Sequence, residues 1–274
     1  MKTDFIILGA QKCGTTTLFE ILNQHPALEG SRPKEPHFFS DNPDWRDRLP
    51  EYEALFSNGA GKLRFEGSTT YTFFPHRNLA LWDDLYEYHP GLKFLYLVRR
   101  PLARITSAYM HLYERGWLDL PIDEAIFRKP LLLDVTRYHT QIAPYIERFG
   151  RDRVLILDFD DFNRQRREVM DRVAAFLEID PRGFGDVETV RSNVSVGGLK
   201  PHFRYDNPSL PLRMVRDLLP GLWRRITENS ARKFQTRPQL SPAHRRAAIR
   251  LLEPEIDALA RLMDKDLAHW KQTD

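Results

Sequence analysis

The feature that most constrains the fold is the order of an apolar run, a glycine-bearing loop and a helical pattern at the start of the chain. Residues 5–8 (FIIL) are typical of a short buried strand, and a loop with a glycine at each end follows at residues 9–14. Apolar side chains then recur at helical spacing over residues 15–22, and Pro26 cannot continue a helix. These residues predict the opening strand–loop–helix unit of an α/β fold.

Two later segments have the same continuous apolar character. Residues 93–98 and 153–157 are predicted buried strands, each followed by a helical pattern, and residues 62–66 form a weaker strand candidate. Continuous apolar strands that alternate with helices indicate a parallel sheet covered on both faces. We therefore expect an α/β fold of the P-loop type, with a central parallel sheet, helices on both faces and a helical C-terminal part.

The composition is that of a folded protein. The 274 residues are 42% hydrophobic and 29% charged, which excludes disorder, coiled coil and collagen. Cys13 is the only cysteine, so an internal disulfide and a metal site built from cysteines are excluded, and no metal is expected. With 41 Lys and Arg against 38 Asp and Glu, the net charge of +3 gives no reason to expect a nucleic-acid partner.

The second half of the chain is predicted to be mainly helical. Residues 169–177 form an amphipathic run, and residues 241–270 are expected to form a final helix. Between them, residues 191–211 are rich in Pro, Gly and Asn, and we expect a loop that covers a ligand. The chain, residues 1–274, is then a single domain, because the helical segment after the loop is too short to fold alone.

No targeting segment is predicted. The apolar run at residues 5–8 is broken by Gly9, and a signal peptide or a membrane span needs a longer apolar stretch. We expect a cytoplasmic protein, or a soluble part of a larger one, without an integral membrane segment.

The loop at residues 9–16 (GAQKCGTT) has the chemistry of an anion site. Its backbone N–H groups and those of the first helical turn converge, the helix dipole adds positive charge, and Lys12, Thr15 and Thr16 add donors. A nucleotide 5′-phosphate suits this site. A Walker A loop places its Lys directly before Ser or Thr, whereas Lys12 comes two residues before Gly14. The spacing therefore disfavours metal-dependent phosphoryl transfer.

A second basic segment follows the strand at residues 93–98. Pro101 suits a first helical turn, which places Arg99 at the end of the strand and Arg104 and Ser107 on one helix face. Arg99 and Ser107 can bind a phosphate without a metal; exposed arginines paired with carboxylates are the alternative. Two anion sites on successive strand ends describe a ligand with phosphates at both ends, surrounded by Lys12, Arg99 and Arg104.

Residues 7–18 (ILGAQKCGTTTL) resemble the 5′-phosphosulfate loop of sulfotransferases that use 3′-phosphoadenosine 5′-phosphosulfate (PAPS). The likeness is closest to the heparan-sulfate N- and O-sulfotransferase branch and its bacterial relatives. It implies that Arg99 and Ser107 bind the 3′-phosphate of PAPS and of the product 3′-phosphoadenosine 5′-phosphate (PAP). Residues 193–200 resemble the loop that covers the donor. The donor-binding residues implied are Gln11, Lys12, Cys13, Gly14, Thr15, Thr16, Arg99, Ser107 and Lys200. If Cys13 lies in this loop, a thiol reagent should block donor binding.

The resemblance also implies the catalytic residues. Sulfuryl transfer needs a base for the acceptor proton and a cation near the leaving phosphate. Glu35, in the stretch RPKEPHFF at residues 32–39, matches the catalytic Glu of the family, and Lys12 would assist the leaving phosphate. Flanking Pro and Phe residues predict a partly desolvated carboxylate, and a surface ion pair with Lys34 is the alternative.

Two histidines are further candidates. His37 is an alternative base, although a histidine beside aromatic residues is more often packed than catalytic. His111 lies four residues beyond Ser107, one turn along the same helix face, where N-sulfotransferase relatives carry a histidine. It ranks second to Glu35.

The acceptor is not encoded in a motif. Residues 66–71 (EGSTTY) resemble a family turn in which glycan-modifying relatives often have a substrate-contacting Lys where Gly67 stands, which counts against an anionic polysaccharide. Residues 40–58 and 116–133, the loops expected at the acceptor pocket, leave open a hydroxyl or amine of a carbohydrate, a lipid or a small metabolite. A P-loop kinase and a non-catalytic nucleotide-binding module are the alternative functions. The oligomeric state is not predicted.

Overall fold

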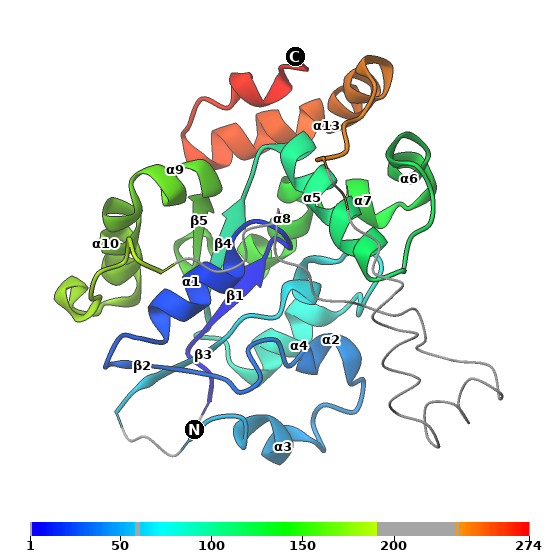
Figure 1. The fold of residues 1–274 in the computed structure, drawn as a ribbon. Coiled ribbons are helices and arrows are strands. Elements are labelled where there is room, and N and C mark those ends of the chain that lie inside the picture. The colour runs from blue at the N-terminus through cyan, green and yellow to red at the C-terminus, as the bar shows by residue number, and fades with distance from the viewer. Residues whose placement is uncertain (1, 58–60, 191–233, 235, 274) are drawn as a thin grey trace, which may run out of the picture.

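One sheet of five parallel strands forms the centre of the protein, in the order β2-β3-β1-β4-β5. The computed structural model describes residues 2–57, 61–190, 234 and 236–273 (Figure 1). The strands are β1 (Phe5–Gly9), β2 (Leu28–Gly30), β3 (Leu63–Glu66), β4 (Lys93–Val98) and β5 (Val154–Asp158). The predicted α/β fold with a central parallel sheet is confirmed. The sequence missed β2, because three residues are too few to show a period.

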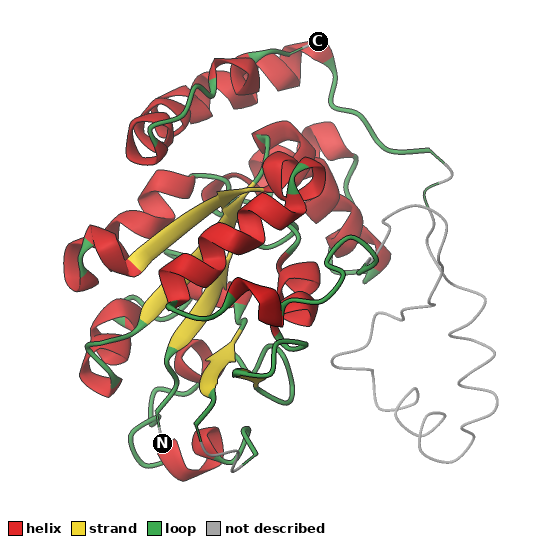
Figure 2. Cartoon of the chain, turned by 90° about the vertical axis from the view of Figure 1, so that its left-hand side faces the viewer, coloured by secondary structure: helices red, strands yellow, loops and turns green. Residues whose placement is uncertain are grey.

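Helices lie on both sides of the sheet, as predicted (Figure 2). The α-helices of the described residues are α1 (Thr15–Leu22), α2 (Phe38–Asp41), α3 (Leu49–Glu53), α4 (Leu81–Tyr88), α5 (Pro101–Glu114), α6 (Ile122–Arg128), α7 (Leu131–Asp134), α8 (Tyr138–Phe149), α9 (Phe159–Arg164), α10 (Arg166–Leu177) and α13 (Pro242–Met263). Short 3₁₀ helices are η1 (Thr69–Thr72), η2 (Arg151–Arg153), η3 (Pro181–Gly183) and η4 (Ala268–Lys271). The segments expected to be acceptor loops thus contain the short helices α3 and α6 and overlap with α2 and α7.

The two middle strands carry the core. Every residue of β1 is buried, and in β4 only Lys93 is not. Phe5 stands opposite Phe65 of β3 on one side and Lys93 of β4 on the other, and its ring stacks on Phe65 at a centroid distance of 4.9 Å. Burial of each large apolar side chain contributes roughly 1.5–3 kcal/mol, which explains why these strands have no polar alternation.

The strand order creates a crevice at the carboxyl end of β1. This strand pairs with β3 on one side and with β4 on the other, so the chain leaves it toward one edge of the sheet and later crosses to the opposite side. Open α/β sheets bind ligands at such a topological switch point, outside the carboxyl ends of the strands. The predicted phosphate loop follows β1 directly, and Arg99 follows β4.

The final helix is shorter than predicted. α13 ends at Met263 because Asp264 adopts a left-handed conformation (φ 49), and the chain resumes as η4, which carries the buried Trp270. Buried apolar residues continue past the end of the helix, so their pattern gave no sign of the break. Lys265 joins this end of the chain to the end of β5, with its ammonium 2.6 Å from carboxylates of both Asp158 and Asp161. The expected covering loop, residues 191–211, and Lys200 lie outside the described residues.

Candidate active site

The loop between β1 and α1 has the backbone geometry of an anion cradle. Gly14, directly before α1, has φ 89, and a Cβ atom there would lie 2.9 Å from the ring of Phe159. Lys12 is also left-handed (φ 70), and the N–H of Cys13 donates to the carbonyl of Ala10 at 3.1 Å. Because Gly14 has no side chain to cap the helix, the first-turn N–H groups of α1 remain available to a ligand.

A cavity of about 630 Å³ opens at this end of the sheet. Its volume is in the range of ligand sites, roughly 300–1,000 Å³. The residues that line it come from the loop, from the segment before α2 and from the elements that follow β3, β4 and β5: Gln11, Lys12, Gly14, Thr15, Thr16, Thr17, Glu35, Thr69, Arg99, Ser107, His111, Arg115, Phe159, Asn163, Arg166 and Val190. This set holds four Lys and Arg side chains and one carboxylate, so the cavity suits an anionic ligand.

Lys12 and Arg99 form one cationic wall. The guanidinium of Arg99 donates to the carbonyl of Lys12 at 3.2 Å and lies over the ring of Phe159 at 4.4 Å from its centroid. Burial lowers the pKa of Lys12; Glu114 opposes that shift and the nearby arginines, Arg115 foremost, add to it. The two predicted phosphate sites therefore meet in one cavity.

Helix α5 and Arg115, the residue that directly follows it, contribute three side chains at intervals of four residues. Ser107, His111 and Arg115 lie on one face and line the cavity, the arrangement expected for residues one turn apart. The ring of His111 meets Trp117 edge-on at 6.3 Å, and Arg115 lies over the same indole at 4.9 Å. The predicted positions of Ser107 and His111 on one helix face are thus observed.

Arg104 does not line the cavity, contrary to prediction. It is only 1% exposed, and its guanidinium donates to the carbonyls of Gln11 (3.1 Å) and Leu132 (3.0 Å) and to the hydroxyl of Thr136 (3.1 Å). The charged group of Arg104 therefore lies beneath the loop, where it holds the backbone of Gln11, and it does not face a ligand.

Cys13 is also turned away from the cavity. Its side chain is fully buried, with the sulfur 3.7 Å from the hydroxyl of Tyr138, and burial raises the pKa of the thiol to about 11. The thiolate is the reactive form of cysteine. The expectation that a thiol reagent would block the loop is therefore wrong, because the thiol is both inaccessible and protonated.

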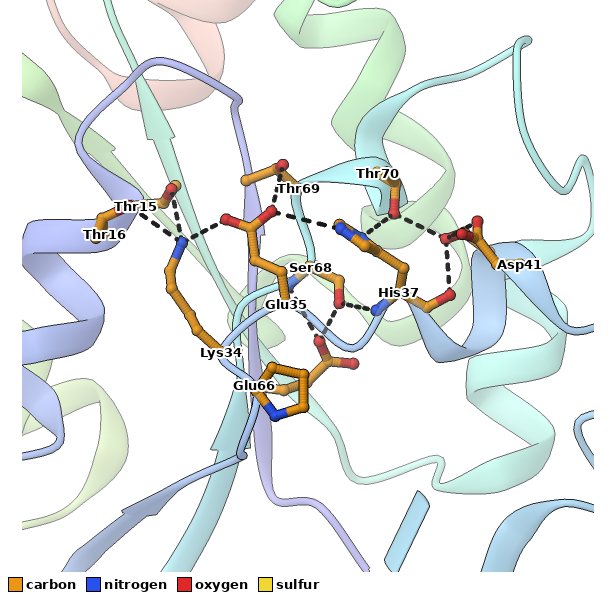
Figure 3. A network of polar contacts seen from close by, with 12 residues as sticks. Thr15, Thr16, Lys34, Glu35, His37, Asp41, Glu66, Ser68, Thr69 and Thr70 are labelled. Atoms are coloured by element: carbon orange, nitrogen blue, oxygen red, sulfur yellow. Dashed lines mark hydrogen bonds and ion pairs between the residues drawn. The ribbon is translucent and has the colours of Figure 1, made fainter. Parts of the chain in front are cut away.

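Glu35 reaches the cavity within a network of polar contacts (Figure 3). Its Oε1 lies 2.6 Å from Nζ of Lys34, and its Oε2 accepts a hydrogen bond from the hydroxyl of Thr69 at 3.2 Å. The side chain is 32% exposed. Glu35 thus forms the ion pair with Lys34 that the sequence gave as the alternative to a catalytic carboxylate, and it also lines the cavity.

His37 lies next to Glu35 but does not line the cavity. Its Nε2 is 3.7 Å from Oε2 of Glu35, and its Nδ1 is 2.9 Å from the hydroxyl of Thr70 (Figure 3). Its backbone is left-handed (φ 54), and its N–H donates to the hydroxyl of Ser68 at 2.8 Å. Of the two acid–base candidates in this stretch, Glu35 is the one that lines the cavity.

The turn after β3 is anchored by a buried carboxyl group. Glu66 is fully buried, and it accepts hydrogen bonds from the backbone N–H of Ser68 (3.0 Å) and from the hydroxyl of Tyr52 (3.2 Å). Burial raises the pKa of Glu66 to about 7. The next residue, Gly67, donates its N–H to the carbonyl of Lys34 at 3.0 Å, so this turn holds the segment that carries Glu35.

Several lining residues were missed by the sequence analysis. Arg115 follows His111 by one helical turn, a spacing that the sequence did contain. Arg166 belongs to α10, far from the phosphate loop in the sequence, and its guanidinium donates to the carbonyls of Val187 and Val190, both at 3.0 Å. Thr69 comes from η1. No local pattern distinguishes Arg166 or Thr69, because only the packing of the helices brings them to the cavity.

Comparison with known families decides the class of the protein. The sequence matches the family model described as "Sulfotransferase domain" over residues 2–201. The chain belongs to this family. The resemblance to sulfotransferases noted in the phosphate loop is thereby confirmed.

Carbohydrate sulfotransferase 15 of Rattus norvegicus is 22% identical over 283 residues, which cover 78% of this chain and 50% of the relative. The bifunctional heparan sulfate N-deacetylase/N-sulfotransferase 2 of Homo sapiens is 26% identical over 201 residues, which cover 65% of this chain and 22% of the relative. The chain therefore spans half or less of the length of these relatives.

A solved structure has the same fold. The sulfotransferase from Alicyclobacillus acidocaldarius superposes with a TM-score of 0.71 at 24% identity and covers 99% of this chain and 100% of its own.

Two features are absent from the residues that the structure describes. None of the helices in that part of the chain combines the length and the apolar character that a membrane crossing requires. Nor do three or more His, Cys, Asp or Glu side chains of that part gather as a metal site would need.

Proposed function

We propose that the protein is a sulfotransferase that moves a sulfuryl group from PAPS to a hydroxyl or amine of an acceptor, and that residues 1–274 form one such domain. The observation that carries this proposal is that a single cavity is lined by the phosphate loop with Lys12, by Arg99 with Ser107, and by Glu35. A ligand that carries a phosphate at each end fits this set of residues, and its reacting group can lie beside the base.

The chain offers two sets of donor-binding groups in the cavity. At the 5′ end, the residues proposed to bind are Gln11, Lys12, Cys13, Gly14, Thr15 and Thr16, with Cys13 limited to its backbone. Arg99 and Ser107 are proposed to bind the 3′-phosphate, and Lys200 completes the set from outside the described residues. The cationic lining matches the several negative charges of PAPS without a metal.

Bound PAPS would supply a sulfuryl group: the acceptor atom forms the new bond to sulfur as the bond to the 5′-phosphate oxygen breaks, and the electron pair of that bond stays on the phosphate. Glu35 is proposed to take the acceptor proton, since its carboxylate lines the cavity. Lys12 is proposed to stabilise the negative charge that grows on the leaving phosphate. His111, on the α5 side of the cavity, is the second candidate for proton transfer.

The relatives point to a carbohydrate acceptor, since their names specify a carbohydrate or heparan sulfate. A lipid and a small metabolite are the other acceptor classes. An acceptor series that contains all of these, assayed with PAPS as donor, separates them by rate.

Isothermal titration calorimetry tests the proposal. We expect PAP to bind without metal and ATP with Mg²⁺ to bind more weakly. Tighter, metal-dependent binding of ATP would favour a P-loop kinase instead. If PAP binds but no acceptor in the series yields PAP from PAPS, the chain is a non-catalytic nucleotide-binding module.

A further inference from the structure

Arg104 is a buried cation to which the proposed mechanism gives no role. Its side chain is 1% exposed, and burial lowers its pKa. A guanidinium nevertheless stays charged at neutral pH, because its ordinary pKa lies above about 12. A full positive charge therefore lies in the interior, where Nε of Arg104 donates to the carbonyl of Gln11 in the phosphate loop at 3.1 Å.

The hydrogen-bond acceptors of Arg104 in the described part of the chain are all neutral. Besides the carbonyl of Gln11, they are the side-chain oxygen of Gln11 (3.5 Å), the carbonyl of Leu132 (3.0 Å) and the hydroxyl of Thr136 (3.1 Å). These contacts occupy the N–H donors of the guanidinium, but they bring no negative charge. A buried charge without an opposite charge destabilises a protein, so this arrangement is unfavourable until a ligand binds.

The titratable groups that act on Arg104 do not balance its charge either. They are Tyr138, Cys13 and Tyr96. Burial raises the pKa of each of these three groups above its ordinary value, so all of them are neutral near pH 7. Among the residues that the structure describes, the charge of Arg104 therefore stays unbalanced.

A different buried arginine of the chain does have a counter-ion. Arg64 is 3% exposed, and its Nε lies 3.9 Å from a carboxylate oxygen of Glu29. It lies near the amino end of β3, whereas the cavity opens at the carboxyl end of the sheet. The unbalanced charge of Arg104 thus lies at the end of the sheet where an anionic ligand is proposed to bind.

The charge of Arg104 acts on the cavity although the side chain does not line it. Burial lowers the pKa of Lys12, and the charge of Arg104 lowers it further. Lys12 lines the cavity. A buried charge is screened little by salt or water, and a charge that disfavours a proton on Lys12 attracts an anion at the same place.

We propose that the buried charge of Arg104 strengthens binding of the 5′-phosphate of the donor from beneath the loop, without contact to the ligand. This inference rests on the proposed function, which places that phosphate in the loop. Arg104 is then a positioning residue, and the bound phosphate balances its charge. A side chain that only holds the backbone of Gln11 is the competing explanation.

The charge of the phosphate separates the two explanations. The phosphate of 5′-AMP changes from a monoanion to a dianion with an ordinary pKa of about 6. A fixed charge attracts a dianion twice as strongly as a monoanion, so loss of the charge of Arg104 should weaken binding of the dianion about tenfold and of the monoanion about threefold. The pKa of the bound phosphate should then rise by about 0.5. A loosened loop would weaken both forms alike and leave this pKa unchanged.

Two variants change the charge beneath the loop in different ways. Arg104→Gln removes the charge and keeps an N–H donor for the carbonyl of Gln11. Thr136→Asp keeps Arg104 and places a carboxylate beside its guanidinium, which balances the charge without removing the side chain that holds the loop. Phosphorus NMR measures the pKa of bound 5′-AMP, and circular dichroism shows that each variant is folded. Both variants should raise this pKa.

Calorimetry measures the dissociation constants of PAP, 5′-AMP and 3′-AMP. At pH 8, PAP and 5′-AMP should bind about tenfold more weakly to Arg104→Gln than to the wild type. Binding of 3′-AMP, which has no phosphate for the loop, should change less than about twofold.

Two controls match these variants. Thr136→Asn changes the same position as Thr136→Asp without adding a charge, and the pKa of bound 5′-AMP should equal that in the wild type. Arg64→Gln removes a buried arginine far from the cavity and should leave this pKa and all three dissociation constants unchanged.

The possible outcomes are distinct. A pKa of bound 5′-AMP that is the same in the wild type, Arg104→Gln and Thr136→Asp would overturn the role of the charge, as would equal weakening of 5′-AMP and 3′-AMP. If Arg104→Gln does not fold, the comparison of Thr136→Asp with Thr136→Asn decides alone. All of these results leave the proposed function standing, whereas a wild type that binds neither PAP nor 5′-AMP would refute the proposed function and this inference together.

Discussion

At the scale of single residues, a substitution of Glu35 should separate donor binding from sulfuryl transfer. Glu35→Gln keeps the shape of the side chain and removes its capacity to accept a proton at neutral pH. We expect turnover with PAPS to fall about 10²–10⁴-fold, the usual contribution of a general base, while PAP affinity changes less than about threefold. Steady-state rates and calorimetry measure the two quantities.

The exposed Glu20 of α1 provides a control for that experiment. Glu20→Gln removes a carboxylate from the same small region of sequence and should leave turnover unchanged. Unchanged turnover in Glu35→Gln would remove Glu35 as the base and leave His111 as the candidate to test next.

Arg99 should have the opposite effect. Arg99→Ala removes the guanidinium that faces the cavity, and we expect PAP affinity to fall roughly 10- to 100-fold, equivalent to about 1.5–3 kcal/mol for a charged hydrogen bond. The neighbouring Arg100 is exposed and does not line the cavity, so Arg100→Ala is the matched control. Equal affinities in the two variants would contradict the assignment of the 3′-phosphate site.

Arg99 and Arg104 show what residue type alone cannot decide. Both are arginines close to Pro101, and the sequence assigned both to the ligand. In the structure Arg99 lines the cavity, whereas Arg104 is buried and donates to backbone carbonyls. Arg99 lies between β4 and α5 and reaches the cavity, whereas Arg104 lies within α5 and packs beneath the phosphate loop.

At the scale of elements, the turn that connects β3 to η1 makes stability depend on pH. Burial raises the pKa of Glu66 to about 7, whereas the ordinary pKa of a glutamate is 4.5. Between these two pH values the folded protein keeps a proton that the unfolded chain has lost. Stability should therefore fall as pH rises from about 4.5 to about 7, by roughly 3 kcal/mol in total. Urea denaturation across this range measures it.

Glu66→Gln provides the reference. The variant has no proton to lose, so its free energy of unfolding should lack this decrease, and the difference from the wild type should change by roughly 3 kcal/mol across the interval. Parallel pH profiles for the two proteins would show that Glu66 does not hold a proton in the folded state near neutral pH.

At the scale of the whole molecule, the C-terminal end supports the phosphate loop. Trp270 is 2% exposed, and its ring lies 6.2 Å from that of Tyr138, whose hydroxyl donates to the carbonyl of Arg99 at 2.8 Å. The sulfur of Cys13 also lies 3.7 Å from that hydroxyl. The last residues of the chain are therefore two contacts from the cavity.

We expect Trp270→Ala to lower the free energy of unfolding by about 3–5 kcal/mol, because it leaves a large cavity in the core. PAP affinity should fall as well, since Tyr138 loses its neighbour. Trp117 is 49% exposed, and Trp117→Ala should change stability by less than about 0.5 kcal/mol. Urea denaturation and calorimetry compare the two variants. An equal loss of stability in both would count against the role of Trp270 in holding the phosphate loop.

The sequence by itself determined the features that are local. A continuous apolar strand, a loop with Lys12 and Gly14, and a helix that starts at Thr15 follow one another within 22 residues, so their chemistry and their order are readable without a fold. The carboxyl end of β4 and the face of α5 were readable for the same reason. Backbone hydrogen bonding and apolar periodicity act over a few residues, and these signals extend no further.

Only the tertiary structure decided which of these residues meet. Four features depend on side chains from separate elements that pack together. They are the contact of Lys34 with Thr15 and Thr16, the position of Arg166 at the cavity, the burial of Cys13 and the burial of Arg104 beneath the loop. Packing satisfies many neighbours at once, and no single segment contains that information. The sequence therefore predicted an anion site, and the fold decided which of the charged side chains line it.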